Sequence, residues 1–144
     1  MNSVEESDSR EMQSLQAYLN EYGQQAEVLS RQLDFMERQR MESIAAIETL
    51  KGLMSQSEPI VLVPVGGGAT VRAKIMDADN ILVNIGADVV LRRTNKEAAE
   101  YLEDHVKELE AVEKKIAESL DRIKSQINDI VRRIEKGYQN AKTG

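Results

Sequence analysis

The sequence predicts an α+β chain: a long antiparallel intrachain coiled coil is interrupted by two central β-hairpins, which join a β-barrel shared between subunits. Apolar residues recur at helical spacing over residues 12–54 and again over residues 98–141, two stretches of almost equal length. Nearly all the strand-forming sequence lies between them, at residues 60–93. Aromatic residues make up only 3% of the chain beside 31% charged residues, which indicates a narrow apolar seam instead of a deep core.

These patterns divide the chain into three regions. Residues 1–57 form an N-terminal coiled-coil helix, whose first eight or so residues are polar and expected to be disordered. Residues 58–94 hold the two hairpins and serve assembly, and residues 95–144 form the C-terminal coiled-coil helix.

The N-terminal helix is predicted by apolar residues spaced alternately by three and four, which is the pattern of a coiled-coil seam. Arg40 occupies a seam position, and the steps from Met36 to Arg40 and from Arg40 to Ile44 are both of four, a stutter that locally relaxes a supercoil. The seam residues are Met12, Leu15, Leu19, Tyr22, Ala26, Leu29, Leu33, Met36, Ile44, Ile47, Leu50 and Met54.

The C-terminal helix begins at a capping signal, because Thr94 or Asn95 can cap and Glu97 stands where a capping-box acid belongs. If the chain reverses through its middle, the seams pair with Met54 facing Ala98 and Met12 facing Ala141. Two independent amphipathic helices packed on a globular body remain the alternative. The second seam comprises Ala98, Leu102, His105, Leu109, Val112, Ile116, Leu120, Ile123, Ile127, Ile130, Ile134, Tyr138 and Ala141.

Two β-hairpins are predicted in the middle region. Strands at 60–65 and 69–76 flank three glycines, and strands at 81–85 and 89–93 flank the turn at 86–88. Both alternating faces of the first strand are apolar, so it needs cover that so short a segment cannot supply, and Pro64 marks an edge or a bulge. We therefore predict an oligomer interface made of Ile60, Val61, Leu62, Val63, Val65, Val71, Ile81, Val83, Ile85, Val89 and Leu91.

The motif LVPVG followed by NILVNIGADVVLRRT, between helical patterns of equal length, resembles the archaeal prefoldin α subunits. Four strands match the α type, since β-type subunits of that family carry a single hairpin. The resemblance implies an ATP-independent chaperone, a hetero-hexamer of two α and four β subunits whose hairpins form a double β-barrel platform. It also implies that coiled-coil tips hold non-native proteins and pass them to a group II chaperonin.

In such a coiled coil the free end lies near the two chain termini, where Gly23 and Gly137 weaken the helices and favour fraying. The residues predicted to bind clients there are Met12, Leu15, Leu19, Tyr22, Ile130, Ile134 and Tyr138. Two alternatives stay open. These residues can simply fill the seam, and the chain can be a scaffold or tether that docks one defined folded partner.

An enzyme, a metal site and a cofactor are not expected, because the chain has no Cys and a single His. The glycines at 66–68 lack the Lys-Ser/Thr pair of a phosphate loop, and Asp77 and Asp79 lack the rest of a calcium loop. The formal net charge of −6, without a one-sided basic face, disfavours nucleic acid and membrane surfaces. With no long apolar run and an acidic, polar start, the chain is expected to be cytoplasmic.

Overall fold

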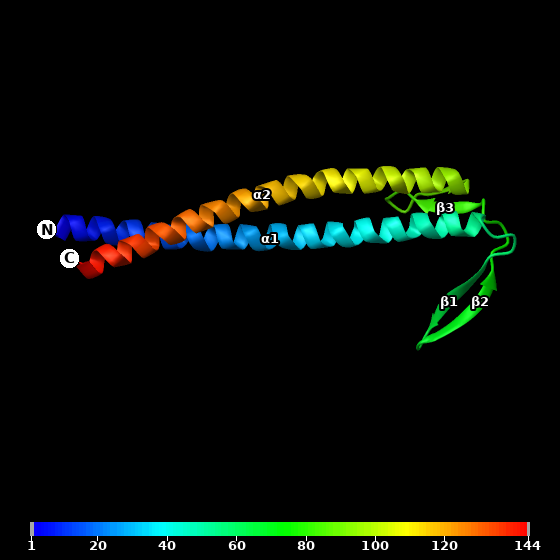
Figure 1. The fold of residues 1–144 in the computed structure, drawn as a ribbon, viewed down its shortest axis with the longest axis horizontal. Helices are drawn as coiled ribbons and strands as arrows, with labels where there is room; N and C mark the ends of the chain where they lie inside the picture. Colours follow the sequence, from blue (N-terminus) through cyan, green and yellow to red (C-terminus); the bar gives the residue numbers. More distant parts are fainter. Residues whose placement is uncertain (1, 144) are drawn as a thin grey trace. The chain divides into compact units, whose positions relative to one another are not determined.

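The computed structural model contains two long helices with four short strands between them in the chain (Figure 1). It describes residues 2–143, and the side chains at positions 3 and 5–140. The α+β class and the helix–hairpin–hairpin–helix order are confirmed, and the strands begin and end within two residues of the predicted bounds. The elements are α1 (Asn2–Met54), β1 (Ile60–Gly66), β2 (Ala69–Lys74), β3 (Ile81–Asn84), β4 (Val90–Arg93) and α2 (Asn95–Thr143).

Helix α1 starts earlier than the sequence predicted. Residues 2–8 are helical, although the polar N-terminus was expected to be disordered. This stretch contains neither Gly nor Pro, and its acidic residues, Glu5 in the first turn among them, interact favourably with the positive end of the helix dipole. The helix can therefore extend beyond the first seam residue.

The chain divides into two compact units that cut across both long helices. One unit is Met1–Glu37 with Ala111–Gly144, and the other is Arg38–Glu110. The sequence had placed its boundaries where helix meets hairpin, after residues 57 and 94. A coiled-coil turn contacts the facing turn of the other helix more than its own distant neighbours, so units form across the pair.

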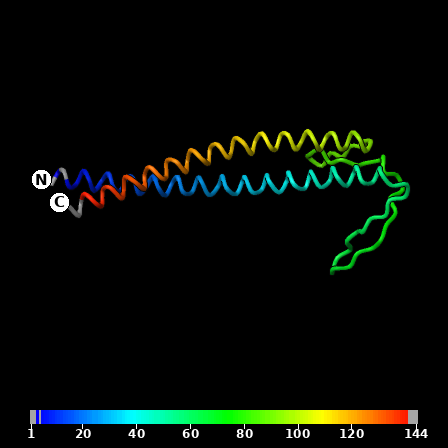
Figure 2. Tube along the Cα trace, in the orientation of Figure 1, coloured from blue at the N-terminus to red at the C-terminus, as the bar shows by residue number. Residues whose placement is uncertain are grey.

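The first unit is an antiparallel helix pair with a small apolar core. Leu15 of α1 packs with Ile130 and Ile134 of α2, and each of the three is only 8% exposed. Met12, Leu19 and Tyr22 pack against this cluster and are partly buried. The first turns of α1 and the last described turns of α2 lie side by side, at the blue and red ends of the trace in Figure 2.

The register of this pair differs by about one turn from the prediction. Met12 lies against Gly137 instead of Ala141, whose side chain is outside the described residues. Equal seam lengths indicated that the helices pair, but they do not determine the offset, because a shift of four residues leaves a helical seam facing the same way.

The second unit also pairs the helices in antiparallel fashion. Arg40 Nη1 lies 3.9 Å from Glu110 Oε1, and Lys51 Nζ lies 3.3 Å from Glu103 Oε1. Arg40 is thus a partly buried seam position with an acidic neighbour on α2, which explains how the apolar stripe tolerates it. The buried positions between the helices are mostly small: Ser43, Ile47, Ala98, Ala99 and Val106.

Strands β1 and β2 form an antiparallel hairpin with a bulge, one of the two features that Pro64 indicated. Pro64 pairs with Thr70 and Gly66 pairs with Ala69, so Val65 is an extra residue in β1. The bulge follows from Pro64, which has no N–H to donate to a ladder. The three turn glycines have φ of +103°, +59° and +78°, a region that favours glycine.

Strands β3 and β4 form a separate two-stranded sheet, in which Val83 pairs with Leu91. Its turn is tight: the Gly86 N–H donates to Asn84 Oδ1 at 2.9 Å. Ala87 has φ +50° and Asp88 has φ +60°, so two residues with side chains occupy the left-handed region.

A buried asparagine joins three segments where α2 begins. Asn95 is 4% exposed, and its Nδ2 donates to the carbonyls of Leu50 at 2.8 Å and Ala78 at 3.0 Å. Its backbone N–H donates to Asp79 Oδ1 at 2.9 Å. Capping itself is done by Thr94, one of the two predicted candidates, whose Oγ1 accepts from the N–H of the residue three positions on, at 3.1 Å.

Candidate interaction surfaces

The hairpin β1–β2 leaves apolar side chains exposed on both of its faces. Ile60 and Leu62 are 55% and 65% exposed on one face, while Val63 and Val71 are 40% and 49% exposed on the other. Val61 is partly buried. The predicted requirement for cover on both sides is therefore not met within the chain, which is what a surface for another polypeptide requires.

The hairpin β3–β4 has one half-buried face and one exposed face. Ile81, Val83 and Leu91 share the half-buried face, so these three predicted interface residues are already partly covered within the subunit. Leu82 and Val90 occupy the outer face and are 66% and 53% exposed. Sequence analysis missed them, because alternation in ILVN and VLRR does not say which face turns outward.

Two further predicted interface positions lie at the turn of this hairpin. Ile85 and Val89 are 43% and 46% exposed. The Ile85 N–H donates to the Val89 carbonyl at 3.0 Å, which closes the turn and fixes both side chains near its rim. They extend the exposed apolar surface beyond the ends of the two strands.

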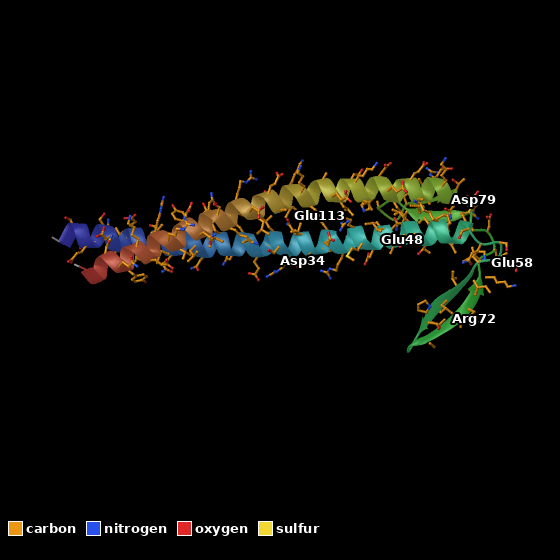
Figure 3. The ribbon with its side chains drawn as sticks, in the orientation of Figure 1. Asp34, Glu48, Glu58, Arg72, Asp79 and Glu113 are labelled. Atoms are coloured by element: carbon orange, nitrogen blue, oxygen red, sulfur yellow. The ribbon has the colours of Figure 1, made fainter. Side chains whose placement is uncertain are left out.

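Basic residues border one apolar face of the hairpin β1–β2. Arg72 and Lys74 of β2 share a face with Ile60 and Leu62, and Lys74 Nζ lies 3.7 Å from Glu58 Oε2. Arg72 is labelled on β2 in Figure 3. A partner that covers this face meets apolar and positively charged groups together.

The first unit carries a second surface, near its helix ends. An open cleft of about 590 Å³ is lined by Met12, Leu15, Gly137 and Tyr138 together with polar and charged side chains. Asp8 and Glu11 come from α1, and Arg133 and Lys136 come from α2, so the rim holds two acids and two bases.

The seven predicted client-binding residues lie together at this end, but their exposure differs. Tyr138 is 57% exposed, and Met12, Leu19 and Tyr22 are partly buried. The other three, Leu15, Ile130 and Ile134, form the closed core of the unit. The helices continue through both predicted weak points, so no fraying is seen at Gly23 or Gly137.

The two glycines differ in their surroundings. A Cβ at Gly23 would have nothing within 4 Å, whereas one at Gly137 would lie 2.8 Å from Met12 Sδ. Gly137 is therefore a position where the end of the Met12 side chain packs against α2, whereas the sequence alone had explained this glycine only as a weakening of the helix.

In the part of the chain that the structure describes, no group of three or more His, Cys, Asp or Glu could hold a metal ion. Likewise, over residues 2–143, no helix is long and apolar enough to cross a membrane. His105 lies on α2 with its Nδ1 3.9 Å from Glu108 Oε2.

Comparison with known proteins shows which family shares this architecture. The family model described as "Prefoldin subunit" matches residues 22–140, which include both hairpins and most of both helices. The chain belongs to the prefoldin family. Prefoldin subunit alpha of Methanoculleus marisnigri is 49% identical over 96% of this chain and 93% of its own length. Prefoldin subunit alpha of Methanoregula boonei is 47% identical over 95% of this chain and 90% of its own.

A solved structure supports the same relationship. The cryo-EM structure of filamentous PFD from Methanocaldococcus jannaschii resembles this chain with a TM-score of 0.66 and 26% identity, over 78% of this chain and 94% of that one. The predicted resemblance to prefoldin α subunits is confirmed, and the chain is a subunit of the prefoldin chaperone family.

Proposed function

We propose that this chain is the α subunit of an ATP-independent holdase that assembles through its hairpins and holds non-native proteins at the ends of its helices. The observation that carries the assembly is the exposure of apolar side chains on both faces of β1–β2. We infer that the partners are prefoldin β subunits, in a hetero-hexamer of two α and four β subunits, as the family resemblance implies.

The exposed hairpin faces support a shared β-barrel. Leu62 and Leu82 are each about two-thirds exposed, and burying such side chains fully contributes roughly 1.5–3 kcal/mol apiece. Each hairpin is also a two-stranded sheet with two free edges. Partner strands that pair with these edges would cover apolar surface and satisfy the backbone at once, which removes a site of aggregation.

Client binding is proposed at the cleft between the helix ends. Tyr138 and Met12 are accessible there and the mostly buried Leu15 also lines the cleft, while Ile130 and Ile134 become available only if the helix pair opens. Contacts through a few partly exposed side chains are weak, because ordering a client offsets much of the gain. Several such ends in one oligomer raise the effective concentration, and weak contacts permit release to a group II chaperonin without ATP.

The assembly is tested by co-expressing the chain with prefoldin β subunits and measuring the mass of the complex. We expect a mixed oligomer for the natural chain and its loss for Leu62→Glu, which places a charge on the exposed hairpin face. Phe35→Glu is the matched control, since Phe35 is 57% exposed on α1, away from the strands in sequence. A monodisperse monomer of the natural chain in the presence of β subunits would refute the assembly.

The client site is tested with the assembled complex. We expect Tyr138→Ser to weaken the suppression of client aggregation, whereas Tyr101→Ser, a 39% exposed tyrosine in the other unit, leaves it unchanged. Truncating both helix ends should abolish suppression and leave the oligomer intact. Unchanged holding activity after truncation would overturn the site, and binding to one folded protein alone would favour a tether.

A further inference from the structure

The contact between Met12 and Gly137 gives the client site a specific shape. A Cβ built on Gly137 would lie 2.8 Å from Met12 Sδ, 3.4 Å from its Cε and 4.0 Å from its Cγ. The end of the methionine side chain therefore occupies the space that any other residue at position 137 would fill. We call this space the Gly137 notch.

Glycine is a poor helix former, and Gly137 lies inside α2 with the end of Met12 in the space of its missing side chain. Gly23 on α1 has nothing near its missing side chain, and it offers no comparable notch. At Gly137 the absence of a Cβ admits an unbranched thioether, and methionine is flexible enough to enter and leave such a gap.

The notch adjoins the open cleft of about 590 Å³ at the helix ends. Gly137, Met12 and Tyr138 all line the cleft, and Tyr138 is 57% exposed beside it. Met12 is partly buried and packs against the core cluster of Leu15, Ile130 and Ile134, and both Met12 and Leu15 line the cleft. A side chain that enters from the cleft and displaces the end of Met12 would reach the notch, because the atoms nearest to it belong to Met12.

We propose that the Gly137 notch is a subsite for a methionine or leucine side chain of a non-native client, and that Met12 is its intramolecular placeholder. This inference rests on the proposed function and deepens it. Side chains branched at Cβ carry their bulk next to their own backbone, which keeps valine and isoleucine from reaching past the cleft into the notch. The two acids and two bases on the rim balance, so the apolar side chain, and not the net charge of the client, decides binding.

With a placeholder, the apparent affinity is the intrinsic affinity multiplied by the fraction of time that the notch is vacant. Removing it should strengthen client binding, while filling the notch permanently should weaken it. The two changes act in opposite directions on the same site, which separates this inference from a general loss of apolar surface.

The test uses the full-length chain in its assembled form and fluorescent peptides with one central Met, Leu, Val or Ala. We expect Met12→Ala to raise affinity for the Met and Leu peptides about three- to tenfold, with little change for the Val and Ala peptides. Gly137→Ala should reduce binding of the Met and Leu peptides about tenfold, to the level of the Ala peptide. Gly23→Ala is the matched control, because it makes the same change where a Cβ meets open space, and it should bind as the natural chain does.

Helix content and the mass of the assembly are measured for each variant. Because the atoms near the notch belong to the flexible end of Met12, Gly137→Ala is accommodated by movement of that side chain and should fold. If Gly137→Ala does not fold, peptide binding by Met12→Ala alone tests the proposal. The notch is not a client subsite if Met12→Ala binds the Met and Leu peptides no better than the natural chain does. The same conclusion follows if a folded Gly137→Ala binds them fully. Both results leave the proposed function standing as long as truncation of the helix ends still abolishes holding activity.

Discussion

Replacing Asn95 with alanine tests the junction that joins α1, the β2–β3 connection and α2. The side-chain amide makes two hydrogen bonds to the carbonyls of Leu50 and Ala78, and the residue is 4% exposed, so water cannot easily replace it. Each such bond is worth roughly 1–1.5 kcal/mol, and we expect Asn95→Ala to lower the free energy of unfolding by about 2–3 kcal/mol. At roughly 2–4 °C per kcal/mol this corresponds to a fall of about 5–10 °C in the melting temperature.

Two further variants separate the contributions of the Asn95 side chain and of its backbone N–H to stability. Asn95→Asp should destabilise more than alanine does, since an ionised carboxylate has only acceptors and would face two carbonyl oxygens. Asp79→Ala removes only the bond to the Asn95 N–H, and the expected loss is about 1 kcal/mol.

The assay is urea unfolding followed by circular dichroism at 222 nm, with all variants at one protein concentration because association contributes to stability. Asn128→Ala is the control, an exposed asparagine on α2 that should change the free energy by less than about 0.5 kcal/mol. If Asn95→Ala proved no more destabilising than this control, the assignment of Asn95 as a junction residue would be wrong.

Three more predictions concern the hairpins and the cap. Ala87→Gly should stabilise the chain by about 0.5–1 kcal/mol in urea unfolding, because it relieves the φ of +50°, whereas the same change at exposed Ala17 in α1 should destabilise it by about 1 kcal/mol. Arg72→Glu should weaken association with partner subunits several-fold in sedimentation, with a salt dependence opposite to that of the natural chain; an unchanged complex would exclude a charged partner opposite β2. Thr94→Ala should cost about 1 kcal/mol of stability through loss of the helix cap, and Thr49→Ala, an exposed threonine within α1, should cost less than half of that.

The elements of the fold could be predicted from the sequence because each is encoded locally. The 3-4 spacing predicts the helices, the three glycines predict the turn, Pro64 indicates an edge or a bulge, and Thr94 or Asn95 indicates the cap. Each of these signals depends on residues within a few positions of one another, so no tertiary information is needed to interpret them.

The features that the sequence did not predict depend on residues far apart in the chain. Asn95 bonds to Leu50, 45 residues away, and its polar character alone indicated only a cap. The one-turn offset between Met12 and Gly137 depends on how two seams slide past each other, which seam length does not determine. The outward face of β3–β4 depends on what covers Val83, so Leu82 was missed.

The division of the chain also separates the two proposed activities. The interface residues of both hairpins belong to the unit Arg38–Glu110, while the predicted client-binding residues belong to the unit built from Met1–Glu37 and Ala111–Gly144. Changes at independent sites usually add in free energy. We therefore expect a double variant of Leu62→Glu with Tyr138→Ser to lose assembly as the first alone does. Its isolated chain should bind a Met peptide as weakly as the isolated Tyr138→Ser chain, measured at equal chain concentration. If Leu62→Glu itself weakened peptide binding by the isolated chain, the two surfaces would be coupled, and client binding would depend on the hairpins as well as on the helix ends.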